Sequence, residues 1–274
     1  MTTIMDKFSL AGRTALVTGG AGLLGRQFTQ ALGEAGAKVV VADLNLAQAE
    51  AHAETLTRSG LAALPVQVDV TDPVSVGAMV ARAVEHFGSL DVIVNGAALD
   101  PKFDPDNQDA QSGNAFETYP LETWKAAMDV NLTGMFLVCQ AAARQMVAQE
   151  YGKIINICST YGLVGPDQRI YERPDGSRQY KPIYYTVSKA GVLGLTKYLA
   201  TYYAGTNIRV NALTPGGVYN QHDETFLKAY SSRTVIGRMA EQDEMSGAVV
   251  FLASEASAYM TGANLVVDGG WTAW

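Results

Sequence analysis

The sequence contains little cysteine and little histidine. Only Cys139 and Cys158 occur in 274 residues, one in an expected helix and one in an expected strand. Two separated thiols exclude a disulfide framework, so both are expected to be free and buried. The three histidines, His52, His86 and His222, lie far apart with no acidic residue at a ligand spacing. No metal site is therefore predicted, and surface positions are expected for all three.

Long apolar runs and excess positive charge are also lacking. The longest uninterrupted apolar stretches fall far short of a membrane span, and the opening MTTIMDKFSLAGR lacks the apolar run of a signal peptide. The net charge of -7 offers no basic face for nucleic acid. Neither a membrane nor a nucleic acid is expected as a partner, and the cytoplasm is the expected location.

Apolar residues are plentiful and regularly arranged. They make up 48% of the chain, against 17% charged residues, which suffices for a large core in one domain. Short β-branched runs alternate with longer amphipathic segments. We expect strands at TALVTGG, AKVVVAD, LPVQVDV, LDVIVNG, KIINICS, IRVNALTPG and NLVVDGG, and helices over 22–35, 46–59, 73–87, 121–150, 183–203 and 241–254.

This alternation predicts an α/β protein with a three-layer, doubly wound Rossmann fold and about seven parallel strands. A ligand is then expected at the carboxyl ends of the strands. We expect a single domain over residues 1–274, with inserted loops near 100–120 and 165–182. Both loops are polar and long for this fold, so they are expected to shape a substrate pocket.

The first strand ends in a glycine-rich turn, TGGAGLLG, over residues 18–25. Its backbone N-H groups and the following helix N-terminus can bind phosphate, although a plain tight turn is the alternative. The second strand ends at Asp43, whose carboxylate can accept ribose hydroxyls and would repel a 2'-phosphate. No Arg or Lys adjoins Asp43, so NAD is predicted over NADP. Alternatively, Asp43 caps the helix that begins near Asn45.

Tyr185 and Lys189 stand one helical turn apart in IYYTVSKAG. On one helix face, the ammonium can stabilise a tyrosinate and lower the phenol pKa toward neutrality. Such a phenol can act as a general acid or base. The pair alone is equally consistent with packed helix side chains, so its surroundings must decide.

Taken together, the motifs resemble the short-chain dehydrogenase/reductase family, in its compact single-domain branch, over essentially the whole chain. The resemblance rests on TGGAGLLG, the NGAA that follows the fourth strand, DVNLTG, INICST, the Tyr–Lys pair and the VDGGW near the C-terminus. It implies a cofactor site that comprises Gly19, Gly22, Leu24, Gly25, Asp43, Leu44, Asp69, Val70, Asn95, Gly96, Ala97, Tyr185, Lys189, Pro215, Gly216 and Val218.

The same resemblance implies four catalytic residues. Tyr185 would exchange a proton with a secondary alcohol while a hydride passes to the nicotinamide of NAD. Ser159 would hold the substrate oxygen, and Lys189 would both lower the pKa of Tyr185 and bind the nicotinamide ribose. Asn131 would anchor a water that passes protons from Lys189 to solvent.

The sequence departs from the family pattern in three places, of which one is the fourth-strand motif, NGAA instead of NNAG. The glycine spacing is more typical of the extended branch, which keeps open a sugar-nucleotide epimerase or dehydratase that retains NAD. Ser159 and Tyr185 stand about twice as far apart as usual, which leaves Thr160 and Ser188 as alternatives to Ser159. A catalytically silent NAD-binding scaffold is a further alternative.

A resemblance of RIYERPDG and LTKYLATYY to family members associated with bacterial sugar metabolism gives one indication of the substrate, and the composition of the second insertion gives another. This insertion mixes basic and aromatic residues with acids that nearly cancel the charge, namely Arg169, Arg173, Arg178, Lys181, Tyr171, Tyr180, Asp167, Glu172 and Asp175. Such a loop could bind an anionic or hydroxyl-rich ligand, or could be a solvated or subunit-contact loop. We expect a sugar, polyol or sugar acid. A homotetramer is implied by the resemblance, with Trp271 and Trp274 able to reach a neighbour's pocket.

Overall fold

A seven-stranded, all-parallel sheet forms the centre of the protein in the computed structural model, which describes residues 3–100, 114–172 and 179–274. The strand order is β3-β2-β1-β4-β5-β6-β7. The strands are β1 (Thr14–Thr18), β2 (Lys38–Asp43), β3 (Ala63–Gln67), β4 (Val92–Asn95), β5 (Gly152–Ile157), β6 (Ile208–Pro215) and β7 (Asn264–Val267). All seven lie where the apolar runs predicted them, because parallel strands covered on both faces are apolar throughout.

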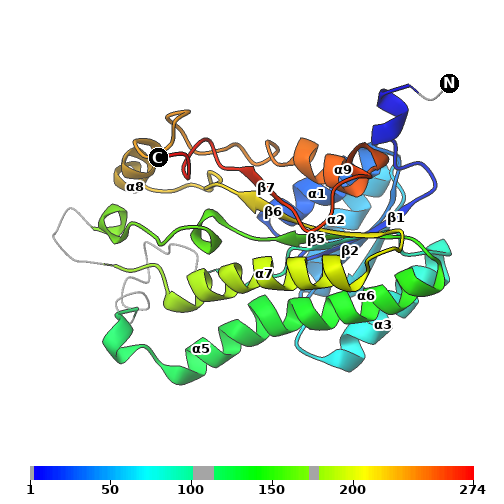
Figure 1. The fold of residues 1–274 in the computed structure, drawn as a ribbon, viewed down its shortest axis with the longest axis horizontal. Helices are drawn as coiled ribbons and strands as arrows, with labels where there is room; N and C mark the ends of the chain where they lie inside the picture. Colours follow the sequence, from blue (N-terminus) through cyan, green and yellow to red (C-terminus); the bar gives the residue numbers. More distant parts are fainter. Residues whose placement is uncertain (1–2, 101–113, 173–178) are drawn as a thin grey trace.

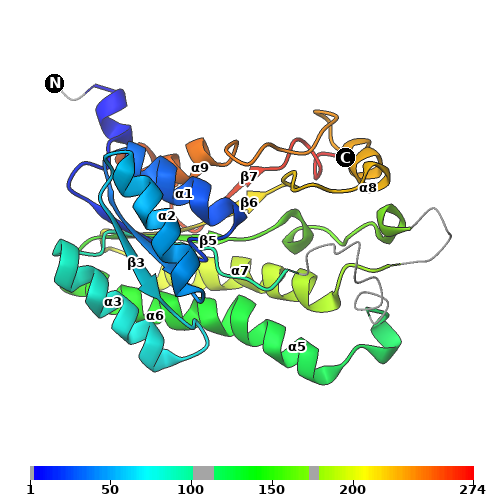
Figure 2. The same ribbon diagram turned by 180° about the vertical axis from the view of Figure 1, so that it is seen from behind.

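Helices cover both faces of the sheet (Figures 1 and 2). One face carries α1 (Leu23–Glu34), α2 (Leu46–Arg58) and α9 (Ser246–Ala253), and the other carries α3 (Pro73–Phe87), α6 (Met135–Ala148) and α7 (Ile183–Tyr202). Two apolar cores result, one on each face. The doubly wound α/β prediction is thus confirmed. Each fully buried aliphatic side chain contributes about 1.5–3 kcal/mol to the stability of the folded protein.

The order of the strands reverses between β1 and β4. From β1 the chain winds outward to β2 and β3, and it then returns to β4 and winds the other way. Connections leave the strand ends in opposite directions at this point, so a crevice opens between them. The glycine turn after β1 and the NGAA segment after β4 meet there.

The helix expected over 121–150 is interrupted by a π-helical turn. It consists of α5 (Leu121–Met128), the π turn at Asp129–Gly134 and α6. By length and composition alone, the stretch Leu121–Ala148 could span a membrane. However, α6 packs onto the sheet through buried side chains such as Val138 and Met146, as core helices do.

Two features of the C-terminal region differ from the prediction. The helix expected over 241–254 begins only at Ser246, because the Glu244 carboxylate accepts the Glu241 N-H and pairs with Arg238, forming a turn. A short helix that was not predicted, α8 (Glu224–Ser231), is capped by Asp223, whose side chain accepts the Phe226 N-H at 2.9 Å. In both views α8 lies beside the C-terminus (Figures 1 and 2).

Candidate active site

A crevice of about 950 Å³ lies at the carboxyl ends of the strands. Every residue of the predicted cofactor site lines it except Asn95. Three of the four predicted catalytic residues, Ser159, Tyr185 and Lys189, also line it, whereas Asn131 does not. The structure therefore brings the nucleotide motifs and the proton-transfer candidates into one cavity.

The glycine turn is fixed by close backbone contacts. Gly19 has a φ of +66°, and a Cβ there would lie 3.0 Å from the Ala97 nitrogen. A Cβ on Gly25 would lie 2.0 Å from the Gly19 oxygen, so only glycine fits. Gly22 is the N-cap of α1, and no side chain caps this helix. The turn thus exposes helix N-H groups of the kind that bind phosphate.

Asp43 braces this turn as well as facing the crevice. One carboxylate oxygen accepts the Ala21 N-H at 3.1 Å and the other accepts the Asn45 N-H at 3.0 Å. Asn45 itself caps α2 by accepting the Gln48 N-H. The alternative in which Asp43 caps this helix is therefore wrong in detail, because the Asn45 side chain does so.

Asp69 and Val70 line the crevice beyond β3. The Asp69 carboxylate accepts both the N-H and the hydroxyl of Thr71, at 2.9 and 2.7 Å. These hydrogen bonds hold the pKa of Asp69 below its ordinary value. The residue is therefore an anionic acceptor at neutral pH, facing the part of the crevice next to β2.

Ser159, Tyr185 and Lys189 converge from β5 and α7. The Lys189 ammonium donates to the Ile157 oxygen at 2.8 Å and lies 5.8 Å from the Tyr185 ring centroid. The Ser159 and Tyr185 side chains line the same crevice, and the Ser159 Oγ accepts the Tyr161 N-H at 3.2 Å. Of the alternatives to Ser159, Ser188 is fully buried and bonded to the Tyr185 main-chain oxygen, outside the crevice. Ser159 is thus better placed than Ser188.

Gly162 allows the segment after β5 to approach α7 closely. A Cβ there would lie 2.7 Å from both the Cys158 sulfur and the Lys189 main-chain oxygen. Cys158 donates to that same oxygen at 3.2 Å. Both cysteines are buried and free, as predicted. Cys158 thus helps to position the backbone of Lys189.

The direction of the Tyr185 pKa differs from the sequence expectation. Burial raises the pKa of Tyr185 well above 10, the negative charge of Asp100 raises it further, and the hydrogen bond to Ser159 lowers it. Burial also lowers the pKa of Lys189. Desolvation disfavours both charged forms and outweighs the attraction between them. The phenol is therefore protonated at neutral pH.

The Asn131 side chain bonds the segment that follows β4. Its Oδ1 accepts the Leu99 N-H at 2.6 Å, and its Nδ2 donates to the Leu99 oxygen at 3.0 Å. A weaker contact of 3.4 Å reaches Ser188. The side chain therefore fixes the backbone of the segment after β4. No contact between its side chain and Lys189 is present.

Asn95 also lies outside the crevice. Its Nδ2 donates to Asn156 at 2.8 Å, and Asn156 donates to Thr196 at 3.0 Å, which ties β4, β5 and α7 together. Within the described residues its Oδ1 has no hydrogen-bond partner. Asn95 therefore supports the core beneath the crevice, and its inclusion among the cofactor contacts is not supported by its position.

The remaining part of the crevice is aromatic and was only partly foreseen. The Tyr161 and Tyr171 hydroxyls lie 3.0 Å apart, and Phe226 of α8 packs on Tyr171. Of the charged and aromatic insertion residues, Tyr171, Tyr180 and Lys181 line the crevice. Arg169 does not, and it pairs with Asp167 at 2.8 Å. The proposed anion-binding residues Arg173 and Arg178, with Asp175, lie outside the described residues.

Lys181 and Asp100 form an ion pair at the crevice, at 2.5 Å. The Lys181 ammonium also lies 4.2 Å from the Tyr185 ring centroid. Asp100 was not identified from the sequence, because its partner is 81 residues away. A charged side chain two residues after the NGAA segment was the only signal that could have found it.

Two expectations about surface residues were wrong. His52 is buried and its Nε2 bonds the Thr29 hydroxyl at 2.8 Å, whereas His86 is exposed and the half-buried His222 lines the crevice. Trp271 is 4% exposed and stacks on Tyr230 of its own chain, with ring centroids 4.2 Å apart. It therefore packs within its own chain, in a buried cluster with Tyr161 and Tyr230, whereas Trp274 is exposed.

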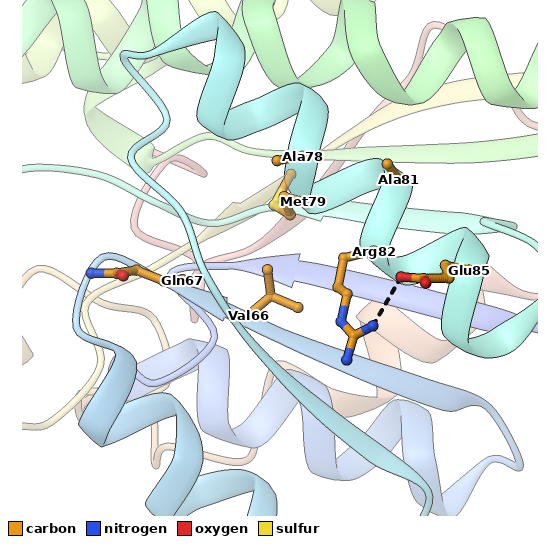
Figure 3. A pocket seen from close by; sticks show the side chains of 7 residues that line it. All are labelled: Val66, Gln67, Ala78, Met79, Ala81, Arg82 and Glu85. Carbon is orange, nitrogen blue, oxygen red and sulfur yellow. Dashed lines mark hydrogen bonds and ion pairs between the residues drawn. The ribbon is translucent and has the colours of Figure 1, made fainter.

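A second hollow lies apart from the crevice, between β3 and α3 (Figure 3). Seven residues line it, and its two charged side chains, Arg82 and Glu85, pair with each other at 2.9 Å. Nothing in it resembles a reactive group. Among the described residues, no group of three or more His, Cys, Asp or Glu is arranged to hold a metal ion.

The fold and the crevice together define a dinucleotide-binding α/β protein, and comparison with known proteins defines the class further. A family model described as Enoyl-(Acyl carrier protein) reductase matches residues 20–272. The chain is 34% identical to 5-keto-D-gluconate 5-reductase of Escherichia coli, over 97% of both chains. It is 38% identical to the 3-alpha-(or 20-beta)-hydroxysteroid dehydrogenase of Mycobacterium bovis, over 95% of this chain and 90% of that one.

A solved structure gives the same result. The gluconate 5-dehydrogenase of Burkholderia cenocepacia, in complex with NADP and tartrate, superposes with a TM-score of 0.84 at 34% identity, covering 99% of this chain and 100% of that one. This chain belongs to the short-chain dehydrogenase/reductase family, whose members are oxidoreductases that use a nicotinamide cofactor.

Proposed function

We propose that this protein interconverts a secondary alcohol or lactol and a carbonyl on a sugar, polyol or sugar acid, with NAD as the preferred cofactor. The observation that carries the proposal is the convergence of Ser159, Tyr185 and Lys189 in one crevice with the glycine turn. The reductase and dehydrogenase relatives named above that act on gluconate-type compounds support a polyhydroxylated substrate.

The crevice fits a dinucleotide. The side-chain-free turn at Gly19, Gly22 and Gly25 would hold the pyrophosphate, and Asp43 would accept the adenosine ribose hydroxyls. A negative charge at Asp43 disfavours a 2'-phosphate, which supports NAD although the Burkholderia relative was solved with NADP. When bound, the nicotinamide ring would accept or supply a hydride.

The residues of this chain would manage the proton. Tyr185 is protonated at neutral pH, so in the reductive direction its hydroxyl can donate a proton to the substrate carbonyl oxygen. In the oxidative direction it must first lose that proton, and the buried Lys189 charge stabilises the resulting phenolate. Ser159, which lines the same crevice, would hold the same substrate oxygen. Asn131 would act by positioning Leu99.

We further propose a single catalytic domain that assembles as a homotetramer. Side chains exposed on α6 and α7 include Phe136, Tyr198 and Tyr202, and the last two stack on each other at 6.0 Å. Exposed aromatic side chains on adjacent helices are typical of a subunit contact. Light scattering of the purified protein measures the number of subunits.

The decisive experiment is an assay of NADH formation over a panel of aldoses, uronates, aldonates, polyols and steroids. Net NADH formation with a sugar, polyol or sugar acid is expected. Activity confined to steroids or acyl thioesters would contradict the substrate class. Tightly retained NAD without NADH release would favour an epimerase or dehydratase, and NAD binding without turnover on any compound would favour a scaffold.

A further inference from the structure

Lys181 is the cation that the crevice offers to a substrate. Of the residues that the structure describes along its lining, only Lys181 and Lys189 are cationic. The Lys189 ammonium is buried on the Ile157 oxygen. The Lys181 ammonium instead lies at 4.2 Å from the centroid of the ring that carries the proposed acid–base group.

The backbone around Lys181 is held in place. Its N-H donates to the Gln168 side chain at 3.0 Å, and Asn114 donates to the Tyr180 oxygen at 3.2 Å. The Lys181 side chain is 14% exposed, so its ammonium is largely withdrawn from water. A fixed, partly desolvated cation binds an anion more strongly than a mobile one on the surface.

Asp100 is the present partner of this ammonium, and it is far more exposed. Its side chain is 47% exposed against 14% for Lys181. An ion pair with one solvent-exposed partner contributes little to stability, so its exchange for another carboxylate costs little. Asp100 can return to water, whereas Lys181 remains beside the Tyr185 ring.

We propose that Lys181 determines the substrate specificity of this site by binding a substrate carboxylate in exchange for Asp100. The preferred substrates are then hydroxy acids, including sugar acids, and neutral alcohols are poorer substrates. The surrounding Gln179, Tyr180 and Asn220 supply neutral groups suited to the remaining hydroxyls. This inference rests on the proposed dehydrogenase function and names the substrate class within it.

The test compares an acid with its neutral analogue. D-gluconate and D-glucitol differ only at one terminal carbon, as do 4-hydroxycyclohexanecarboxylate and 4-(hydroxymethyl)cyclohexanol. The quantity measured is the ratio of kcat/KM for the acid over the alcohol, from NADH formation. Because both substrates use the same Tyr185, damage to the chemical step cancels in this ratio.

Substitutions at the two charged positions are expected to move the ratio in opposite directions. Lys181→Met should lower the acid-over-alcohol ratio by about 10- to 100-fold, which corresponds to the loss of one charge-assisted hydrogen bond. Lys181→Arg should leave the ratio unchanged. Asp100→Asn should raise it by about twofold or more, because the competing carboxylate is gone. Lys228→Met, an exposed lysine on α8 outside the crevice, is the matched control and should leave it unchanged.

Two results would overturn the proposal. The first is an unchanged ratio in Lys181→Met. The second is an equal fall in Lys181→Met and Asp100→Asn, which would make the pair a structural link between two loops. If no alcohol is oxidised at all, the proposed dehydrogenase function is wrong, whatever the role of Lys181. Calorimetric titration then measures gluconate binding directly and still tests the role of Lys181. Binding that is retained in Lys181→Met would then contradict it, and binding lost there but kept in Asp100→Asn would support it.

Discussion

The ammonium group of Lys189 donates a hydrogen bond of 2.8 Å to the main-chain oxygen of Ile157, the last residue of β5. Ser159 follows two residues later and lines the same crevice as the Tyr185 phenol. The end of β5 therefore binds Lys189 directly and brings Ser159 into the crevice that Tyr185 lines. Since the strand is buried along its whole length, the sheet fixes the separation between cation and phenol.

Tyr185→Phe should abolish most of the activity, because the ring remains and only the exchangeable proton is removed. A loss of turnover of at least about 100-fold is expected, with NAD binding retained, since general acid–base groups typically contribute that much or more. Steady-state kinetics with a substrate found in the panel and fluorescence titration with NADH make the two measurements. Tyr184→Phe is the matched control, because Tyr184 is its buried neighbour and lies outside the crevice lining. Near wild-type turnover in Tyr185→Phe would refute the role of this phenol.

The oxidation rate should rise with pH into the alkaline range. Burial raises the pKa of Tyr185, and the phenol must lose its proton before it can accept one from an alcohol. Asp100 raises the same pKa through its negative charge, so Asp100→Asn should move the rising limb to lower pH. The profile of kcat/KM against pH with a neutral alcohol measures the shift.

An exposed carboxylate outside the crevice provides the control variant for this pH profile. Asp243 is exposed and lies outside the crevice lining, so Asp243→Asn should leave the rising limb of the pH profile unchanged. The other titratable groups around Tyr185 are Cys158, Tyr161, Lys181 and Lys189, and all four remain in place in each variant. A limb that stays fixed or moves to higher pH in Asp100→Asn would show that this carboxylate does not act on the phenol.

Asp43→Ala should relax the discrimination between NAD and NADP. The change removes the charge that repels a 2'-phosphate and the acceptor for the ribose hydroxyls. The ratio of kcat/KM with NAD to kcat/KM with NADP should therefore fall by about tenfold or more. The same change also removes the bond to the Ala21 N-H. Asp43→Asn keeps an oxygen that can accept the Ala21 N-H but removes the negative charge. It therefore distinguishes the effect of the hydrogen bond from the effect of the charge. A ratio that is unaltered in both variants would count against Asp43 as the selecting residue.

Local sequence patterns were sufficient for the sheet and the cofactor turn. A buried parallel strand is apolar along its length, so each of the seven strands could be read directly from its own residues. Asp72, Pro73 and Gly88 likewise fix the ends of α3, because an N-cap, a first-turn proline and a left-handed glycine act locally. These elements depend on neighbours in the chain, which the sequence displays.

Contacts between distant segments could not be read in this way. Asp100 and Lys181 are 81 residues apart, and Leu99 and Asn131 are 32 residues apart. The direction of the Tyr185 pKa has the same origin, because it depends on burial by residues from several elements. Spacing along α7 correctly brought Tyr185 and Lys189 to one side, but it could not reveal that desolvation outweighs their attraction.

Asn131→Ala should destabilise the protein in addition to any effect on activity. The side chain bonds both the N-H and the oxygen of Leu99, at 2.6 and 3.0 Å, and it is fully buried. Leaving these two main-chain groups without partners should lower the free energy of unfolding by about 2–4 kcal/mol. Urea unfolding followed by circular dichroism measures the change. Asn207→Ala, at an exposed asparagine, is the control and should stay within about 0.5 kcal/mol of the wild type.

The same variant separates two roles for Asn131. A residue that only anchored a water for proton transfer would lose activity while its unfolding free energy remained unchanged. A residue that positions the segment after β4 would lose stability and would also loosen Asp100, which follows Leu99 directly. Because Asp100 raises the pKa of Tyr185, looser positioning should also shift the alkaline limb of Asn131→Ala toward lower pH. Unchanged stability with lost turnover would therefore favour the water-anchoring role implied by the family resemblance.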